Sequence, residues 1–234
     1  MFWHDSVMSQ MSMGANLEVP SATVRATLRW TAGPGIPEVD ASALLLAENG
    51  EVGSDADFVF YNQAQHGSGA VRMSGKTPPP TASDSIDIDL DRVPAGYRRI
   101  VLAASTDGGS FGQVPELQLE LLDIASGALV ASFPMRADTE TAFVCAELYR
   151  RESGWKFRAI GQGYASGLDG LATDFGISVG GSPTAAPPAA PPPPTAPPAA
   201  APAAAAPPPA PVAPAAAAAA PAASGNLLDL DNPV

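Results

Sequence analysis

The sequence is short of the residues on which most chemistry in proteins depends. It has one cysteine, Cys145, two histidines, and 12 basic residues against 24 acidic ones, so its formal net charge is −12. A single cysteine excludes an intrachain disulfide. Cys145 lies between Val144 and Ala146, where a small buried side chain is expected rather than a reactive thiol. Without a thiol pair or a cofactor motif, direct reductive chemistry is not expected.

Basic residues are sparse, and the close pairs among them are Arg98–Arg99 and Arg150–Arg151. Affinity for phosphate backbones is built from clustered Lys and Arg, and an acidic protein repels polyanions. Twenty-two of the acidic residues and all 12 basic residues precede residue 182, which leaves that part with a net charge of −10. Nucleic acid is therefore not an expected partner, whereas divalent cations or basic partners are.

Long apolar runs are also missing. The alanine-rich stretches near the end are interrupted by proline, so none approaches the ~20 apolar residues that cross a bilayer. The first residues carry no basic, apolar leader of the secretory type. Membrane insertion is not expected, and a cytoplasmic protein is. Residues 1–12 show no periodic pattern, and we interpret them as a flexible N-terminal extension.

Residues 13–181 contain a succession of short alternating segments. Val24, Ala26, Leu28 and Trp30 alternate with polar side chains, as in a half-buried strand. Further strand-like runs follow, most of them bounded by Gly-containing turns: 43–47, 58–61, 86–90, 100–105, 117–123, 129–133, 141–149 and 156–160. The pattern predicts an all-β, antiparallel β-sandwich with a short helix near Gly167–Asp174.

The composition changes sharply after residue 181. Residues 182–224 are almost wholly Pro and Ala, which can neither bury a core nor form a continuous helix, so a disordered Pro/Ala-rich linker is predicted. Residues 225–234 contain an apolar and acidic cluster: Leu227, Leu228, Asp229, Leu230 and Asp231. We interpret this segment as a candidate docking peptide for a protein partner. A solubilising segment with no partner is the alternative.

Seven runs of the predicted sandwich form a further pattern: Val39–Leu46, Ser54–Gln63, Ile86–Leu90, Phe111–Val114, Glu140–Ala142, Glu147–Arg151 and Trp155–Tyr164. Together, and in this order, they resemble the TerD family of bacterial tellurium-resistance and general-stress proteins. The resemblance implies a β-sandwich, in agreement with the alternation, and a calcium-binding, non-catalytic role in the stress response. The resemblance does not extend to residues 182–234.

The resemblance also implies positions for calcium ligands: Asp40, Asp55, Asp57 and Asp84. Hard cations take several carboxylate and carbonyl oxygens, so acids on adjacent loops suit them. Asp55 and Asp57, two residues apart before a strand, are expected to point to the same side. Asp40 opens another strand, and Asp84 is expected in a loop that leads into the next.

Two departures from the family pattern weaken this expectation. Family members carry a further acid where this chain has Ala56, and an acid-rich run where it has the Pro-rich segment Ser74–Asp84. Calcium affinity depends strongly on the number of charged ligands. Weak or single-site binding is therefore expected, and a metal-free adaptor of the same fold is the alternative.

Other polar residues give weaker evidence of a functional site. His66 is the one candidate for general-base work, but no nucleophile context surrounds it, although a Ser-His-Asp set with Ser68 is conceivable. We expect an exposed loop histidine. Asp87, Asp89 and Asp91 alternate with apolar residues, and a solvated outward face of one strand explains them. No catalytic site is therefore expected.

Overall fold

The structure is a computed structural model that describes residues 10–177. These residues belong to the first of two units of the chain, Met1–Thr184. The predicted linker 182–224 and docking peptide 225–234 lie outside the described residues, as do residues 1–9 of the predicted extension.

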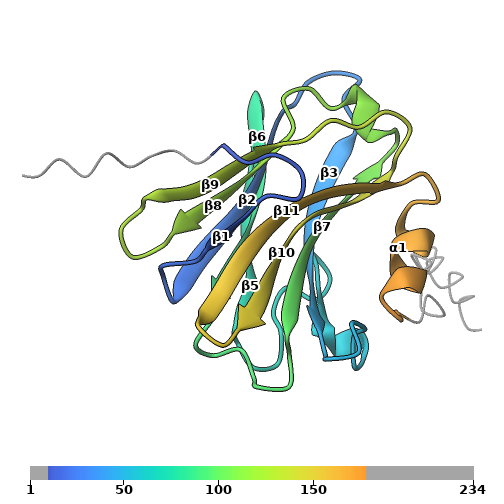
Figure 1. Cartoon of the computed structure of the whole chain (residues 1–234). Helices are drawn as coiled ribbons and strands as arrows, with labels where there is room; N and C mark the ends of the chain where they lie inside the picture. The colour runs from blue at the N-terminus through green and yellow to red at the C-terminus, as the bar shows by residue number, and fades with distance from the viewer. Residues whose placement is uncertain (1–9, 178–234) are drawn as a thin grey trace, which may run out of the picture. The chain divides into compact units, whose positions relative to one another are not determined.

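Eleven strands of the described residues form two sheets (Figure 1). The six-stranded sheet has the order β1-β11-β10-β7-β3-β4 and the five-stranded sheet the order β5-β6-β2-β8-β9. Neighbouring strands within each sheet are antiparallel. The strands are β1 (Asn16–Glu18), β2 (Thr23–Thr31), β3 (Glu38–Leu46), β4 (Phe58–Val59), β5 (Val71–Thr77), β6 (Thr81–Asp89), β7 (Arg99–Asp107), β8 (Gln118–Asp123), β9 (Leu129–Pro134), β10 (Ala142–Arg151) and β11 (Gly154–Tyr164).

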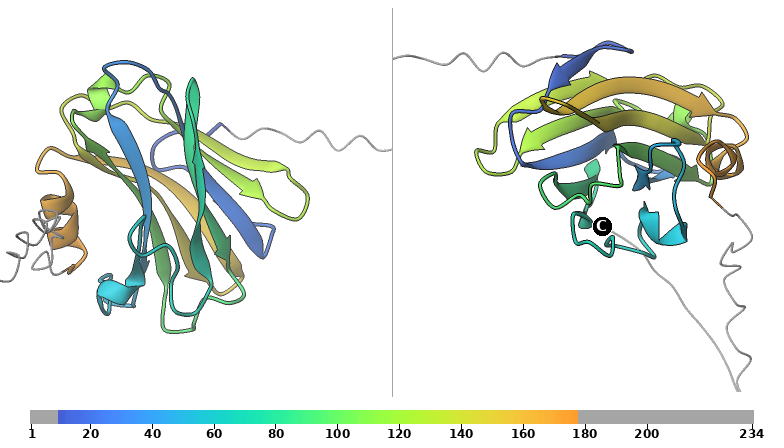
Figure 2. Two further views of the ribbon diagram at one scale, coloured as in Figure 1. Left: turned by 180° about the vertical axis from the view of Figure 1, so that it is seen from behind. Right: turned by 60° about the horizontal axis from the view of Figure 1, so that its bottom comes forward.

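The two sheets pack face to face, as the turned views show (Figure 2), which confirms the predicted antiparallel sandwich. The alternation in β2 gives the reason. Val24, Ala26, Leu28 and Trp30 are all buried in the main core between the sheets. Burying a side chain of the larger kind contributes about 1.5–3 kcal/mol, so the alternating pattern specifies which face of each strand turns inward.

A second apolar layer covers part of the outer face of the six-stranded sheet. Helix α1 (Leu168–Asp174) places Leu171 in a cluster with Leu44, Val101 and Val144. Two short 3₁₀ helices, η1 (Asp55–Asp57) and η2 (Phe111–Gln113), complete the described elements. The predicted short helix near Gly167–Asp174 is confirmed.

The β5–β6 hairpin differs from the sequence prediction. The segment Ser74–Asp84 reads as a loop, yet it runs through the end of β5, a turn, and the start of β6. A bulge between Met73 and Gly75 interrupts the pairing, and Gly75 has φ of 115°, which favours glycine. Asp84 therefore lies inside a strand, not in a loop.

The folded domain also begins earlier than predicted. The Met11 side chain is buried in the main core, and its N–H donates to the carbonyl oxygen of Ser132 at 2.7 Å. Cys145 is buried as expected, and burial raises the pKa of its thiol to about 12. Within residues 10–177, no helix is long and apolar enough to cross a membrane.

Candidate functional site

The four predicted calcium ligands lie at opposite ends of β3. Asp40 is near the start of this strand, and Asp84 on β6 accepts a hydrogen bond from the N–H of Ala41. The helix η1, with Asp55 and Asp57, leads into β4, which pairs with the later part of β3 at Ala43 and Leu44 (Figure 1). At 3.3 Å per residue, Asp40 and Leu44 are separated by roughly 13 Å along the strand. The expected single cluster of carboxylates therefore divides into two.

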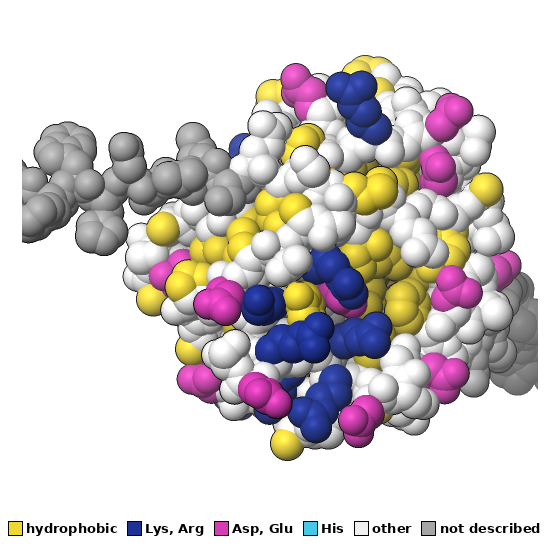
Figure 3. Space-filling view, in the orientation of Figure 1, with side chains coloured by type: hydrophobic (Ala, Val, Ile, Leu, Met, Phe, Trp, Pro, Cys, Tyr) yellow, Lys and Arg dark blue, Asp and Glu magenta, His cyan; other side chains and the backbone are white. Residues whose placement is uncertain are grey.

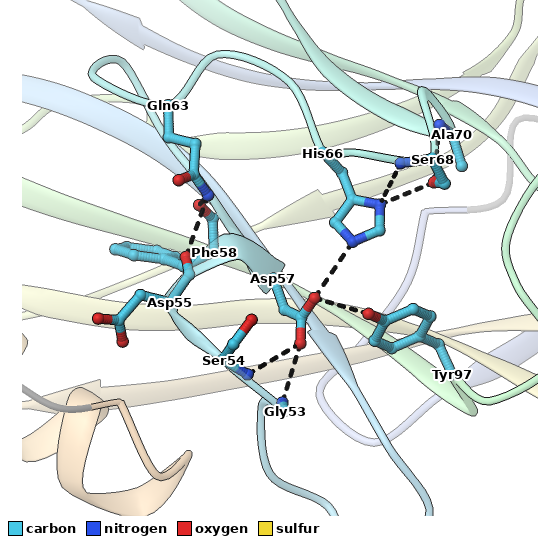
Figure 4. A network of polar contacts seen from close by, with 10 residues as sticks. All are labelled: Gly53, Ser54, Asp55, Asp57, Phe58, Gln63, His66, Ser68, Ala70 and Tyr97. Carbon is cyan, nitrogen blue, oxygen red and sulfur yellow. Dashed lines mark hydrogen bonds and ion pairs between the residues drawn. The ribbon is translucent and has the colours of Figure 1, made fainter.

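Asp57 is the centre of a buried polar network (Figure 4). One carboxylate oxygen accepts from the N–H groups of Gly53 and Ser54 at 2.9 and 3.1 Å. The other accepts from the Tyr97 hydroxyl at 2.6 Å and lies 3.2 Å from His66 Nε2. Its acceptor sites are thus occupied by donors from three parts of the chain.

These contacts decide the charge of the Asp57 carboxyl. Burial alone raises its pKa, but the hydrogen bonds from Tyr97, His66 and the two backbone N–H groups outweigh burial and lower it. Burial, together with the neighbouring carboxylate, raises the pKa of Tyr97 to about 12. Asp57 is therefore an ionised carboxylate whose negative charge is stabilised by hydrogen bonds.

The prediction that Asp55 and Asp57 share a side is wrong. Asp55 is exposed and its side chain points away from the network, whereas Asp57 is buried (Figure 4). The reason is local. The two residues lie in a 3₁₀ helix of three residues per turn, not in a strand, so positions two apart point in different directions.

The prediction for His66 is also wrong, because its side chain is buried. Its Nδ1 lies 2.7 Å from Ser68 Oγ and accepts from the Ser68 N–H at 3.2 Å, which places the ring proton on Nε2, facing Asp57. Ser68, His66 and Asp57 thus form a hydrogen-bonded chain. None of the three residues lines the pockets of about 810, 380 or 260 Å³ found among the described residues. These hydrogen bonds connect η1 to the loop between β4 and β5 and lie outside those three pockets.

At the other end of β3, a lysine lies among the acids. The Lys76 ammonium is 2.5 Å from Asp40 Oδ1 and 2.8 Å from Glu38 Oε1. Burial lowers the pKa of Lys76, but the two carboxylates outweigh burial and raise it. Sequence reasoning missed Lys76, although a lone base in an acid-poor segment was a signal.

Asp84 is the most buried of the four predicted ligands, with 1% of its surface exposed. Its Oδ2 accepts from Ala41 N–H at 2.9 Å, and its Oδ1 is buried with no hydrogen-bond partner among the described residues. Burial raises its pKa, and Asp40 adds to the rise, while Ala41 N–H and Lys76 oppose it.

The carboxylate oxygens of these four residues are not arranged as the calcium site that the resemblance implies. Calcium takes six to eight oxygens, and residues 10–177 contain no group of three or more His, Cys, Asp or Glu side chains placed to hold a metal. The Asp57 carboxylate already accepts hydrogen bonds, among them one from the Tyr97 hydroxyl. The Asp55 side chain points away from Asp57, and Asp40 contacts the Lys76 ammonium.

The prediction that Asp87, Asp89 and Asp91 form a solvated outward face is wrong for Asp87. Asp87 faces outward but is buried beneath two arginines, with Oδ1 2.6 Å from Arg25 Nε and Oδ2 2.6 Å from an Arg72 guanidinium nitrogen. Burial raises its pKa, but these arginines outweigh burial and lower it. Asp89 is half-buried, and Asp91 is exposed beyond the strand. The pairing was missed because its partners lie on neighbouring strands.

The fold and these polar clusters place the chain among two-sheet antiparallel β-sandwiches with a helix on one outer face. Residues 8–175 match the model of the TerD domain. The chain belongs to the TerD family.

Several known proteins are similar to it. Tellurium resistance protein TerD of Serratia marcescens is 39% identical over 151 residues, covering 60% of this chain and 79% of the relative. General stress protein 16U of Bacillus subtilis (strain 168) is 33% identical over 153 residues, covering 61% and 79%. The crystal structure of a homologue of telluride resistance protein (TerD) from Streptomyces coelicolor A3(2) aligns with a TM-score of 0.53 at 19% identity, covering 65% of this chain and 95% of that one. This structure supports the fold, and the two sequences place the chain with tellurium-resistance and stress proteins.

Proposed function

We propose that this chain is a non-catalytic, calcium-independent member of the TerD family that acts in the stress response through contacts with other proteins. The observation that carries the proposal is the position of Lys76. Its ammonium contacts Asp40 and Glu38 and acts electrostatically on Asp84. A cation supplied by the chain itself thus lies beside two of the four acids on which the resemblance places a calcium ion, Asp40 and Asp84.

The chemistry of the cluster supports this substitution. An ammonium is a compact charge with three donors, so it satisfies carboxylate oxygens from several directions without a coordination shell. A calcium ion bound here would have to displace it, and would then find two predicted ligands at the far end of β3.

The non-catalytic part of the proposal rests on the Ser68–His66–Asp57 chain. A serine nucleophile needs a substrate position beside it and donors for the oxyanion. Ser68 Oγ is instead in contact with His66 and accepts from the N–H of Ala70 at 3.1 Å, as in a local turn. Its role is to hold the loop between β4 and β5.

Calcium binding is the second candidate, and one observation favours it. The buried Oδ1 of Asp84 has no hydrogen-bond partner among the described residues, and Asp40 acts on the same carboxyl. A divalent cation that displaced Lys76 would gain both carboxylates. For this candidate, the protein must still bind calcium although the Pro-rich segment Ser74–Asp84 replaces the acid-rich run of the family.

Lysine substitution separates the two candidates. In Lys76→Met, the carboxylates lose their counter-charge, so we expect millimolar calcium to raise the melting temperature of the variant but not that of the wild-type protein. Lys156→Met is the matched control, because Lys156 also pairs with a glutamate, Glu18, at 3.8 Å on a different strand pair. Thermal denaturation of the full chain with calcium, magnesium or chelator measures the effect. A calcium-dependent rise in the wild-type protein would favour the second candidate.

A further inference from the structure

Four basic side chains gather on the outer face of the six-stranded sheet, where Figure 3 shows Lys and Arg close together. They surround Tyr149 on β10. Arg99 and Lys156 pair with Tyr149 across the neighbouring strands, and the guanidinium groups of Arg151 and Arg158 lie 5.3 and 5.4 Å from its ring centroid. We call these four residues and Tyr149 the basic patch.

The patch is not fully neutralised. Glu147 is buried beneath it and pairs with Arg158 and, at 4.0 Å, with Arg99. Lys156 pairs at 3.8 Å with an exposed glutamate of β1, and Arg151 has no ion-pair partner among the described residues. Two carboxylates thus face four cations, on a chain whose net charge is −12.

A shallow groove of about 380 Å³, lined by both charged and apolar side chains, adjoins the patch on the same face. Arg99 and Arg158 belong to both. Its apolar side comes mainly from Ile160 on β11 and from Phe175, which follows α1, and both are partly exposed. Val101 and Val144 form its floor and are buried. In Figure 3, hydrophobic side chains lie beside the basic ones. The surface therefore offers aliphatic contact and positive charge side by side.

We propose that the basic patch and this groove form a docking site for an acidic, leucine-bearing peptide segment of another polypeptide. Arginine and tyrosine dominate the binding energy of many protein interfaces, and opposite charge steers association. Acidic side chains of the segment pair with Arg151 and Lys156, while leucines enter the groove. The site extends the proposed assembly role to a stated partner chemistry, and it does not depend on Lys76, which belongs to the other sheet.

Two observations favour a peptide over other polyanions. The groove gives leucine side chains a place that a phosphate backbone would leave empty, and the net charge of the protein repels a long polyanion. The sequence Leu-Leu-Asp-Leu-Asp of residues 227–231 has the required chemistry, so a second copy of this chain carries such a segment. It provides the probe for the test.

The test uses a fluorescent peptide of residues 225–234 and the full chain. The receptor carries Leu227→Ser, Leu228→Ser and Leu230→Ser, which removes competition from its own segment. Fluorescence anisotropy is expected to show saturable binding that Arg151→Glu with Lys156→Glu weakens at least tenfold. The matched control, Arg92→Glu with Arg136→Glu, makes the same change of net charge at exposed sites outside the patch and should leave binding within twofold. Thermal denaturation verifies that each variant is folded.

A charge exchange makes the test specific. A peptide with Asp229→Lys and Asp231→Lys should bind the Arg151→Glu, Lys156→Glu receptor better than the original peptide does. Absence of saturable binding, or equal weakening by patch and control substitutions, would overturn the proposal. Tighter binding of a single-stranded oligothymidylate or of anionic phospholipid vesicles to the same patch would overturn it in favour of another class of partner.

Discussion

Individual carboxylates of this domain are stabilised by hydrogen bonds or ion pairs with residues that are distant in sequence. Asp57 takes its donors from residues up to 40 positions away, and Asp87 pairs with Arg25, 62 positions away. Hydrogen bonds and ion pairs of this kind offset the cost of burying charge. The charge of both carboxylates is thus stabilised by groups within the fold.

Asp57 and Asp55 form a matched pair for testing this point. Asp57→Asn places an amide NH₂ where the carboxylate oxygens accept hydrogen bonds from N–H and O–H groups. We therefore expect the free energy of unfolding to fall by about 2–3 kcal/mol at neutral pH. Asp55→Asn, at an exposed position, should change it by less than about 0.5 kcal/mol. Urea denaturation measures both, and equal effects would contradict the network.

The pH dependence of this loss has a definite sign. The pKa of Asp57 is lowered in the folded protein, so the carboxylate contributes stability above its unfolded pKa, near 3.9, that is lost as pH falls toward its folded pKa. The difference between wild-type protein and Asp57→Asn should be full above about pH 5 and should narrow below pH 4. A difference independent of pH would contradict an ionised Asp57.

Among the structural elements, α1 shows how a short helix is held. Seven residues are too few for a stable isolated helix, so its stability has to come from packing. Leu171 provides it, because this side chain is buried against the outer face of the six-stranded sheet, whereas Leu168 is 46% exposed.

The two leucines of α1 provide a controlled comparison. Leu171→Ala should destabilise the domain by about 2–4 kcal/mol, through lost burial and the cavity that remains. Leu168→Ala should change stability by less than about 0.5 kcal/mol. Thermal or urea denaturation with circular dichroism checks both. A small effect of Leu171→Ala would mean that α1 does not contribute to the folded domain.

Strands were predictable from sequence where one face is buried, as in β2, because burial imposes a period of two. β5 was not, since only its first residue, Val71, is buried, and of the residues that follow only Met73 packs against the core. The same limit affected the site. The family pattern identified Asp40 and Asp84, which do act on one another, but could not show that Asp55 lies on a 3₁₀ turn or that Tyr97 reaches Asp57. Contacts across 40 residues leave no local signal.

Across the whole molecule, charge is distributed unevenly. The chain is strongly acidic, yet the fold brings bases from three strands to one outer face, and it places a lysine among acids on the opposite sheet. The first arrangement underlies the proposed docking site, and the second underlies the proposed independence from calcium. Both follow from strand pairing, which brings together residues that sequence alone keeps apart.

We propose that Lys76, rather than a calcium ion, neutralises the acids at the start of β3 in this TerD-family chain. Isothermal titration of the full chain, prepared with chelator and then dialysed, measures this most directly. We expect no saturable heat up to millimolar calcium, for the wild-type protein and for Asp84→Asn alike. Saturable heat in the wild-type protein that is lost in Asp84→Asn would contradict it.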